Sequence, residues 1–361
     1  MNGPTLAAIT LTPSGDGVAV VAKLLTEALR ERSNGGLSVV TMFDGPARRP
    51  SFADKVAFAT RLDRRVLFGR PDWVLFSHIG LTRAVRFVPA QMRRPYAVFL
   101  HGVEAWEPLQ AADRTMLAGA SLRLSNSRYT AERVMRANPD IGPVVACPLA
   151  LPQADAPDDT ARPGSLPEAI CNADAQIVLI VGALRSNERY KGHDQLIAAW
   201  PAVVATMPRA HLLIVGDGDD RARIASLAEE SGVGRSISTP GFVDDDVLGA
   251  CYQRSSIFAM PSRGEGFGLV YLEAMSHRLP CIGSRQDAAG EVIQDGVTGL
   301  LVDQHDVSGL AATIVSLLQS PERCRAMGLA GRERLQQEFT VAAFRARLAA
   351  ALDQAFPACA A

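Results

Sequence analysis

The sequence lacks the features that mark membrane-spanning, disulfide-stabilised or nucleic-acid-binding proteins. No apolar run among its 361 residues approaches the roughly 18 needed to cross a bilayer. Its six cysteines are scattered, without Cys-x-x-Cys spacing or a neighbouring histidine, so we expect reduced thiols in a cytoplasmic protein. Aromatic residues make up only 6% and few accompany basic ones, which disfavours nucleic acid as a partner. The uncharged start, residues 1–12, enters a strand-like run, so no signal peptide is expected.

The net charge of −1 conceals a basic first part and an acidic remainder. Residues 1–150 carry 19 of the 37 basic and only 12 of the 38 acidic side chains. Part of the excess lies in a predicted amphipathic helix over residues 51–68, where Phe58 and Leu62 are expected to face outward. This pattern fits either an anionic membrane surface or an ordinary solvated helix. The cations of this region are Lys55, Arg61, Arg64, Arg65 and Arg70.

Apolar strand-like and helical segments alternate in the first half, which is typical of parallel α/β sheets. A Pro-, Asp- and Ala-rich stretch from 156 to 174 then reads as a linker. We therefore expect a first domain over 1–155. The expected strands are 6–11, 37–42, 73–77, 97–100, 122–125 and 144–147, and the expected helices are 18–32, 51–68 and 83–92.

The second half, 175–341, repeats the same alternation. Two Rossmann-like domains in tandem are the natural architecture, with ligands at the carboxyl ends of the strands. The expected strands are 177–181, 211–215, 257–260 and 300–302, with a further strand-turn-helix unit around 241–252. The expected helices are 193–207, 221–231, 308–318, 321–338 and 342–356.

The most informative segment is Gly-Glu-Gly-Phe-Gly-Leu-Val-Tyr-Leu-Glu-Ala-Met, residues 264–275. A helix starting near Gly268 would direct unpaired N–H groups and its positive end at the preceding loop, which suits a phosphate. Glu265 lies on that loop and Glu273 about one turn inside the helix, where carboxylates can accept hydrogen bonds from hydroxyls. Together these features indicate a nucleotide-sugar site.

This segment resembles the Glu-x7-Glu motif of the retaining GT-B glycosyltransferases of family 4, or group 1. The resemblance continues through 280–284, 290–293 and 295–302. It implies that Glu265 approaches the donor sugar, that Glu273 binds the ribose, and that backbone amides contact sugar and diphosphate. It also implies the GT-B fold, with the 342–356 helix crossing back to the first domain. The amides belong to Phe267, Gly268, Leu269 and Val270.

A cationic loop at 185–191 follows the predicted strand 177–181. Cations there can compensate a diphosphate leaving group. The segment is similar to the Arg…Lys-Gly segment of the family and matches it at Lys191. Ala183 stands where the family has arginine, so Arg185 is the substitute we expect, with Arg189 second.

In the first half, His-Gly-Val-Glu-Ala-Trp at 101–106 follows the predicted strand 97–100. It resembles a segment of bacterial mannosyltransferases in which the histidine, here His101, lies beside the donor sugar. Glu104 and Trp106 are either packing residues or acceptor contacts. By the same resemblance, Gly17 approaches the donor diphosphate and the backbone near Val243 contacts the nucleobase.

No metal is expected, although Asp217-Gly218-Asp219 formally matches the Asp-x-Asp of metal-dependent glycosyltransferases. It follows a predicted strand, and Asp219 or Asp220 is placed to cap the next helix. The Asp244 segment reads as a similar cap. The cations around Lys191 already offer the charge that a metal would supply.

The resemblance therefore implies an enzyme without cofactor. It would transfer a hexose from a nucleotide diphosphate sugar, GDP-mannose before UDP-glucose, to a glycan or lipid-linked acceptor in polysaccharide or glycolipid biosynthesis. A cytoplasmic location follows, peripheral at the inner membrane face if the basic helix binds lipid. A nucleotide-sugar epimerase of similar fold and a non-catalytic nucleotide-sugar-binding subunit remain open. The Lys-Gly loop and the Glu265–Glu273 spacing favour transfer, and only Ala183 points toward the binding subunit.

Overall fold

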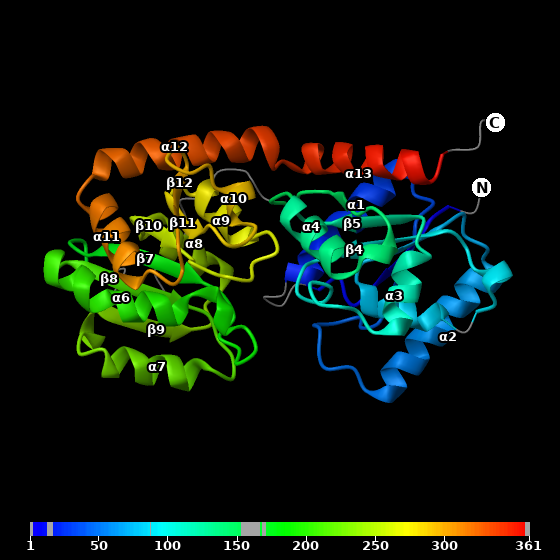
Figure 1. Cartoon of the computed structure of the whole chain (residues 1–361), viewed down its shortest axis with the longest axis horizontal. Coiled ribbons are helices and arrows are strands. Elements are labelled where there is room, and N and C mark those ends of the chain that lie inside the picture. Colours follow the sequence, from blue (N-terminus) through cyan, green and yellow to red (C-terminus); the bar gives the residue numbers. More distant parts are fainter. Residues whose placement is uncertain (1–2, 13–16, 87, 153–166, 168–170, 358–361) are drawn as a thin grey trace. The chain divides into compact units, whose positions relative to one another are not determined.

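The computed structural model describes residues 3–12, 17–86, 88–152, 167 and 171–357. The chain divides into two compact units. The first contains residues 1–152 together with 341–361, and the second contains 153–340. Each unit is built around a parallel sheet of six strands covered by helices (Figure 1).

The first sheet has the order β2-β1-β3-β4-β5-β6, and all its strands are parallel. Strands β1, β3 and β4 form because every side chain in them is apolar or small and can be buried on both faces, as parallel sheets covered by helices require. Their carboxyl ends share one edge of the sheet. The strands are β1 (Thr5–Ala8), β2 (Ser38–Thr41), β3 (Val74–Phe76), β4 (Tyr96–Leu100), β5 (Leu122–Ser125) and β6 (Val145–Ala146).

Two helices of the first unit, α1 (Gly17–Arg32) and α2 (Phe52–Phe68), lie where the sequence predicted them. The helix expected over 83–92 was wrong. That stretch holds two 3₁₀ segments, η1 (Ile79–Val85) and η2 (Ala90–Met92), because prolines at 89 and 95 and a short connection between strands leave no room for a regular helix. Helices α3 (Ala111–Ala118) and α4 (Arg128–Ala137) were not anticipated.

Helix α2 begins at a capping box, in which Ser51 and Asp54 each accept a hydrogen bond from the other's backbone N–H. The expected outward position of Phe58 and Leu62 was wrong. Both are fully buried against the first sheet's core, since they form with Val66 a stripe at four-residue spacing. The large apolar side chains that α2 exposes are Phe52, Val56 and Phe68.

The last helix, α13 (Val341–Ala355), packs on the first unit beside α1, as expected (Figure 1). Ion pairs join Arg345 to Glu31 and Arg32 to Asp353. Arg347 donates a 2.9 Å hydrogen bond to the Pro148 carbonyl, and Phe356 stacks on Trp73 with ring centroids 4.7 Å apart. Within the described residues, no helix is long and apolar enough to cross a membrane.

The second sheet has the order β12-β11-β10-β7-β8-β9, again all parallel. This is the strand order of a classical dinucleotide-binding fold, with its reversal point between β7 and β10. Loops that follow those two strands therefore meet where such sheets bind ligands. The strands are β7 (Gln176–Val181), β8 (Ala210–Val215), β9 (Ile237–Gly241), β10 (Ile257–Ala259), β11 (Cys281–Ser284) and β12 (Gly299–Val302).

Four helices of the second unit begin and end within one residue of expectation: α6 (His193–Thr206), α7 (Arg221–Glu230), α11 (Val307–Leu318) and α12 (Pro321–Glu338). Helix α8 (Asp245–Arg254) lies in the expected strand-turn-helix unit, and α9 (Leu269–Ser276) begins directly after Gly268. Helix α10 (Ala289–Val292) was not anticipated. Asp220 and Asp244 occupy the N-cap positions of α7 and α8, as expected, but neither side chain accepts a capping hydrogen bond. The Asp220 carboxylate binds two arginines instead. Asp219 binds Ser186.

Candidate active site

Two loops of the second unit meet at the reversal point of its sheet. One runs from β7 to Lys191 and the other from β10 to Glu265. Arg263 donates its backbone N–H to the Tyr190 carbonyl at 3.0 Å, and Gly264 packs against the Tyr190 ring. The buried Gln304 side chain donates to the Pro261 carbonyl at 2.9 Å and so fastens the second loop. The sequence-predicted cations and the Glu265 segment are thus brought together.

Lys191 is held by a carboxylate that the sequence reasoning overlooked. Its Nζ lies 2.8 Å from Oε2 of Glu188, while Arg185 Nη1 lies 3.0 Å from Oε1 of the same residue. Burial acts to raise the pKa of Glu188, but the charges and hydrogen bonds of Lys191 and Arg185 outweigh it and lower that pKa. Glu188 thus stays ionised and orients both cations. Its spacing of three from each was a signal available in the sequence.

Arg189, the second choice for the arginine role, is committed elsewhere. It binds Asp220 through two nitrogens, at 3.0 and 2.6 Å. Arg223 binds the same carboxylate and also Asp194. This network joins α6 to the start of α7, so Arg189 takes part in holding the fold together, whereas Arg185 shares Glu188 with Lys191.

Glu265 is fixed through its backbone by Asp287, a second residue that sequence reasoning missed. Its N–H donates to Oδ2 of Asp287 at 3.1 Å, and the Ser262 hydroxyl donates to the same oxygen. Burial raises the pKa of Asp287 to about 6, although these hydrogen bonds act to lower it. Burial also raises the pKa of Glu265, while the charge of Lys191 lowers it. Glu265 and Lys191 are therefore close enough to interact electrostatically.

Helix α9 begins where expected, directly after Gly268. Gly268 has φ +89°, and a Cβ there would lie 2.3 Å from the Tyr271 ring, so only glycine fits. Phe267 is buried, whereas Leu269 and Val270 remain partly exposed at the first turn of the helix. The amides of this turn lie between Glu265 and Glu273 in the chain, at a helix N-terminus, which is a position that suits an anion.

Glu273 is anchored by Tyr252 of α8. The Tyr252 hydroxyl donates to Oε2 of Glu273 at 2.8 Å, and the Tyr252 ring stacks on His277. Burial raises the pKa of Glu273, and the hydrogen bond from Tyr252 lowers it. One carboxylate oxygen is thereby fixed, and Oε1 is the one left to meet a hydroxyl. Val243 lies in the loop between β9 and α8, next to the exposed Phe242.

His101 of the first unit lies at the carboxyl end of β4. Its Nε2 is 2.7 Å from the Ser77 carbonyl, so Nε2 carries the proton and Nδ1 is the acceptor in the neutral ring. Asn126 donates to the His101 carbonyl at 2.6 Å. Ser77 Oγ and Asn126 Oδ1 are buried and have no hydrogen-bond partner among the described residues. This sheet edge therefore offers polar atoms to a ligand.

Gly17 is the first residue of α1, which follows β1, so it belongs to the same edge of the first sheet. The turn expected at 13–16 lies outside the described residues. No described atom lies within 4 Å of a Cβ built at Gly17. Packing in the described part of the chain therefore does not require glycine at this position.

The carboxylates of the Asp-x-Asp segment are used within the fold. Asp217 accepts the backbone N–H of Gly218 at 2.9 Å, and Asp219 accepts both the N–H and the hydroxyl of Ser186. These hydrogen bonds lower the pKa of Asp219. No group of three metal-ligating side chains occurs among the described residues.

Residues 175–320 match the family model described as glycosyl transferases group 1. A GDP-mannose-dependent alpha-(1-6)-phosphatidylinositol monomannoside mannosyltransferase of Mycolicibacterium smegmatis is 34% identical over 217 residues, which cover 57% of this chain and 55% of that protein. A glycogen synthase of Mycobacterium tuberculosis is 35% identical over 162 residues, which cover 45% of this chain and 38% of that protein. The chain thus matches about half the length, or less, of these relatives.

Solved structures resemble the whole chain. Sucrose-phosphate synthase from Thermosynechococcus elongatus superposes with a TM-score of 0.82 at 22% identity, covering 99% of this chain and 100% of that one. Anabaena HepE, in complex with UDP and glucose, has a TM-score of 0.74 at 16% identity, and the match covers 98% of this chain and 100% of that one. These likenesses establish the two-domain GT-B fold. Residues 175–320 are therefore similar to the group 1 glycosyltransferases, and the whole chain shares the fold of sucrose-phosphate synthase.

Proposed function

We propose that the chain is a retaining glycosyltransferase. It transfers a hexose from a nucleotide diphosphate sugar to a hydroxyl of a glycan or lipid-linked acceptor, in polysaccharide or glycolipid biosynthesis. The observation that carries this proposal is the meeting of Lys191, Glu265 and the α9 terminus at the reversal point of the second sheet. Cations and helix amides suit a diphosphate, and flanking carboxylates suit sugar hydroxyls.

The leaving diphosphate lies against the α9 amides, with Lys191 and Arg185 neutralising the charge that grows as the glycosidic bond breaks. Glu188 holds both cations before the donor arrives, which lowers the reorganisation needed during reaction. Lys191 and Arg185 thus take the part that a metal plays in Asp-x-Asp enzymes. No metal step is needed, because Asp217 and Asp219 already bind Gly218 and Ser186.

Glu265 orients the sugar, and Glu273 accepts hydrogen bonds from the ribose hydroxyls. His101 lies beside the sugar, Gly17 approaches the diphosphate, and the backbone near Val243 meets the base. Bond formation is front-face: the departing β-phosphate oxygen accepts the proton of the acceptor hydroxyl as the new C1–O bond forms. The product keeps the anomeric configuration of the donor.

Mannose is favoured over glucose and GDP over UDP. The support is that the mycobacterial relative named for GDP-mannose matches a longer part of the chain than the glycogen synthase does. The name of that relative also includes a phosphatidylinositol glycolipid, which favours a lipid-linked acceptor and a location at the inner membrane face. The exposed Phe52, Val56 and Phe68 of α2 give the first unit apolar side chains for such a surface.

A donor screen tests the proposal. GDP-mannose, GDP-glucose, UDP-glucose and UDP-galactose are incubated with the protein, and nucleotide release and the released sugar are followed by NMR. We expect release from GDP-mannose above all, with the α configuration initially retained. An initially formed β anomer would contradict retention, and a C2-epimerised sugar would indicate an epimerase. Preference for a UDP-sugar would overturn the donor assignment alone.

A further inference from the structure

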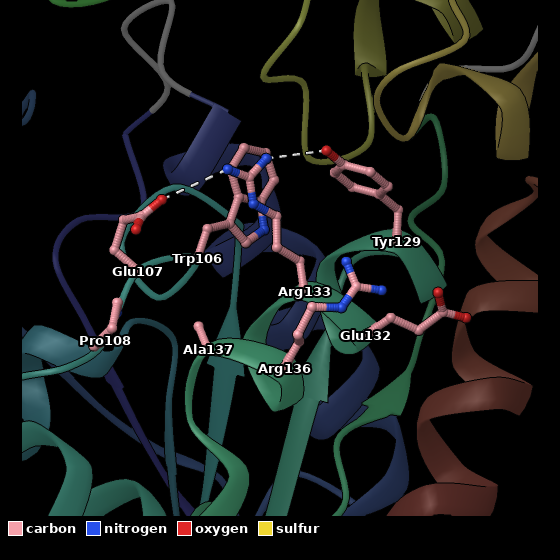
Figure 2. A pocket seen from close by; sticks show the side chains of 8 residues that line it. All are labelled: Trp106, Glu107, Pro108, Tyr129, Glu132, Arg133, Arg136 and Ala137. Atoms are coloured by element: carbon pink, nitrogen blue, oxygen red, sulfur yellow. Dashed lines mark hydrogen bonds and ion pairs between the residues drawn. The ribbon is translucent and has the colours of Figure 1, made fainter.

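The first unit contains a cavity of about 550 Å³ between the loop that follows β4 and helix α4 (Figure 2). This volume lies within the range of small-molecule sites. Arg133 lies over the Trp106 ring at 4.6 Å, and the Tyr129 ring stands perpendicular to that of Trp106 with centroids 5.6 Å apart. Two aromatic rings and a guanidinium thus form its wall. The lining also includes Glu107, Pro108, Glu132, Arg136 and Ala137.

The walls of this cavity are fixed to one another. The buried Asn138 accepts the Leu109 N–H at 2.8 Å and donates to the Ala105 carbonyl at 3.2 Å, which joins the loop to the end of α4. Gly102 has φ +146°, and a Cβ there would lie 2.8 Å from the Trp106 ring. The indole therefore packs directly on backbone that only glycine allows, and the site is preorganised rather than formed by chance at the surface.

The cavity presents more hydrogen-bond donors than its own side chains satisfy. Trp106 is only 6% exposed, yet its Nε1–H has no partner among the described residues. Arg136, which projects from α4 beside Arg133, likewise has no hydrogen-bond or ion-pair partner among the described residues. By contrast, Arg133 donates to the Tyr129 hydroxyl at 3.0 Å and lies 3.6 Å from a Glu107 oxygen (Figure 2). Arg136 is thus the cation available to a ligand.

The remaining chemistry points to a hydroxylated ring. Glu132 supplies a carboxylate, which accepts hydrogen bonds from hydroxyls, and Trp106 and Tyr129 supply apolar ring surfaces. An uncompensated guanidinium and an unpaired indole N–H among the lining residues call for an anionic, acceptor-rich group, for which phosphate is the common partner. A ligand with all these properties is a sugar or cyclitol that carries a phosphate.

We infer that this cavity binds a phosphorylated sugar or cyclitol, with Arg136 on the phosphate, Glu132 on ring hydroxyls and Trp106 donating its indole N–H. The same ligand chemistry occurs in a free sugar phosphate and in the headgroup of a glycolipid. The ligand is the acceptor, an assignment that rests on the proposed transferase function. The binding of a phosphorylated sugar or cyclitol to this cavity does not depend on that function.

Calorimetric titration of the full chain with mannose 6-phosphate, mannose and inorganic phosphate tests the inference without any donor turnover. We expect mannose 6-phosphate to bind about tenfold or more tightly than mannose, the effect of one hydrogen-bonded charge. Arg136→Ala removes this advantage and Arg136→Lys keeps part of it. Arg114→Ala, which removes an exposed cation of α3 outside the cavity, leaves it unchanged. Trp106→Phe weakens mannose 6-phosphate binding while keeping a ring in place.

Vesicles distinguish the two sources of the ligand. For a lipid headgroup, wild-type protein binds phosphatidylinositol vesicles better than charge-matched phosphatidylserine vesicles, and Arg136→Ala abolishes the difference. For a free sugar phosphate, Arg136→Ala changes only the titration with mannose 6-phosphate. Equal affinity for mannose and mannose 6-phosphate, no binding of either at millimolar concentration, or a wild-type result with Arg136→Ala overturns the inference. The donor screen stands or falls independently of these outcomes.

Discussion

The ammonium nitrogen of Lys191 lies 2.8 Å from Glu188, whose other carboxylate oxygen holds Arg185. The cations proposed to meet the diphosphate are therefore paired and oriented before any donor binds. A carboxylate shared between two cations leaves a net positive charge, so the group can still attract an anion. Replacing Lys191 alone both removes a cation and deprives the partly buried Glu188 carboxylate of a partner, so the single substitution mixes two effects. A double variant that also neutralises Glu188 separates them.

Lys191→Ala should lower turnover at saturating donor by about 10²–10³-fold, because the lost charge acts mainly on the transition state. The double variant Lys191→Ala with Glu188→Gln should be as slow, since removing the unpaired carboxylate does not restore a cation. Arg235→Ala, an exposed cation elsewhere in the second unit, serves as control. Steady-state kinetics with GDP-mannose give the measurement. Wild-type turnover in the single variant, or recovery in the double, would contradict the role of Lys191.

Glu273→Ala should weaken the binding of GDP by roughly 1.5–3 kcal/mol, the value of a hydrogen bond to a charged group. Tyr252→Phe should weaken it less, because the carboxylate remains and only its 2.8 Å anchor is lost. Calorimetry measures both affinities, and circular dichroism confirms that the variants fold. Unchanged affinity in a folded Glu273→Ala protein would remove Glu273 from the nucleotide site.

Asp287 should leave a pH signature in stability. Burial raises its pKa in the folded protein to about 6, above the ordinary value of 3.8. Its protonated form is therefore favoured by folding, and its contribution to the free energy of unfolding is largest below about pH 4 and is lost as pH rises through about 6. Urea unfolding of wild type and Asp287→Asn across pH 4–7 isolates the contribution of Asp287 to the free energy of unfolding. A pH-independent difference between the two proteins would refute it.

Activity should survive EDTA, since Lys191 and Arg185 supply the positive charge at the diphosphate. Asp217→Asn should likewise keep most activity, because its carboxylate only accepts a backbone N–H within its own turn. Nucleotide release from GDP-mannose before and after chelation checks this. Complete loss with EDTA, reversed by Mg²⁺ or Mn²⁺, would establish a metal requirement instead.

Helix α2 should bind anionic vesicles through side chains that the structure exposes. Phe52 and Phe68 are 84% and 81% exposed, and the exposed Arg64 lies one helical turn before Phe68. Phe52→Ser with Phe68→Ser should reduce co-sedimentation with anionic liposomes, and added salt should reduce it further as charges are screened. Phe339→Ser would disturb the core and is unsuitable as a control, whereas Leu329→Ser removes an exposed apolar side chain of α12. Equal binding to neutral and anionic vesicles would contradict the prediction.

Much of the fold could be predicted because parallel strands buried on both faces are continuous apolar runs. Strands such as Tyr96–Leu100 and helices such as α12 therefore have boundaries visible in the sequence. The 3₁₀ segments at 79–92 were missed, since their short connection and prolines override helical spacing. For α2, the sequence located the helix but not its buried stripe, because apolar residues occur on both of its faces.

In the candidate site, the sequence located the Glu265 and Lys191 loops, whose residues are consecutive. It missed Glu188, whose spacing of three from each cation was the one local signal, and it could not find Asp287 and Tyr252, which act through contacts that only the tertiary structure creates. Asp287 contacts a loop more than twenty residues away in the chain, so no local spacing reveals it. Capping by Asp220 was mispredicted for the same reason, as two arginines compete for its carboxylate.

The placement of α13 on the first unit has a consequence for biosynthesis on the ribosome. The second unit, 153–340, is continuous in the chain, whereas the first is completed only by residues after 340. Residues 1–152 must therefore wait, with the surface beside α1 uncovered, until the whole of the intervening unit has been translated. The inserted unit can fold first, and Trp73, Glu31 and Arg32 receive these partners only after the residues beyond 340 have been translated.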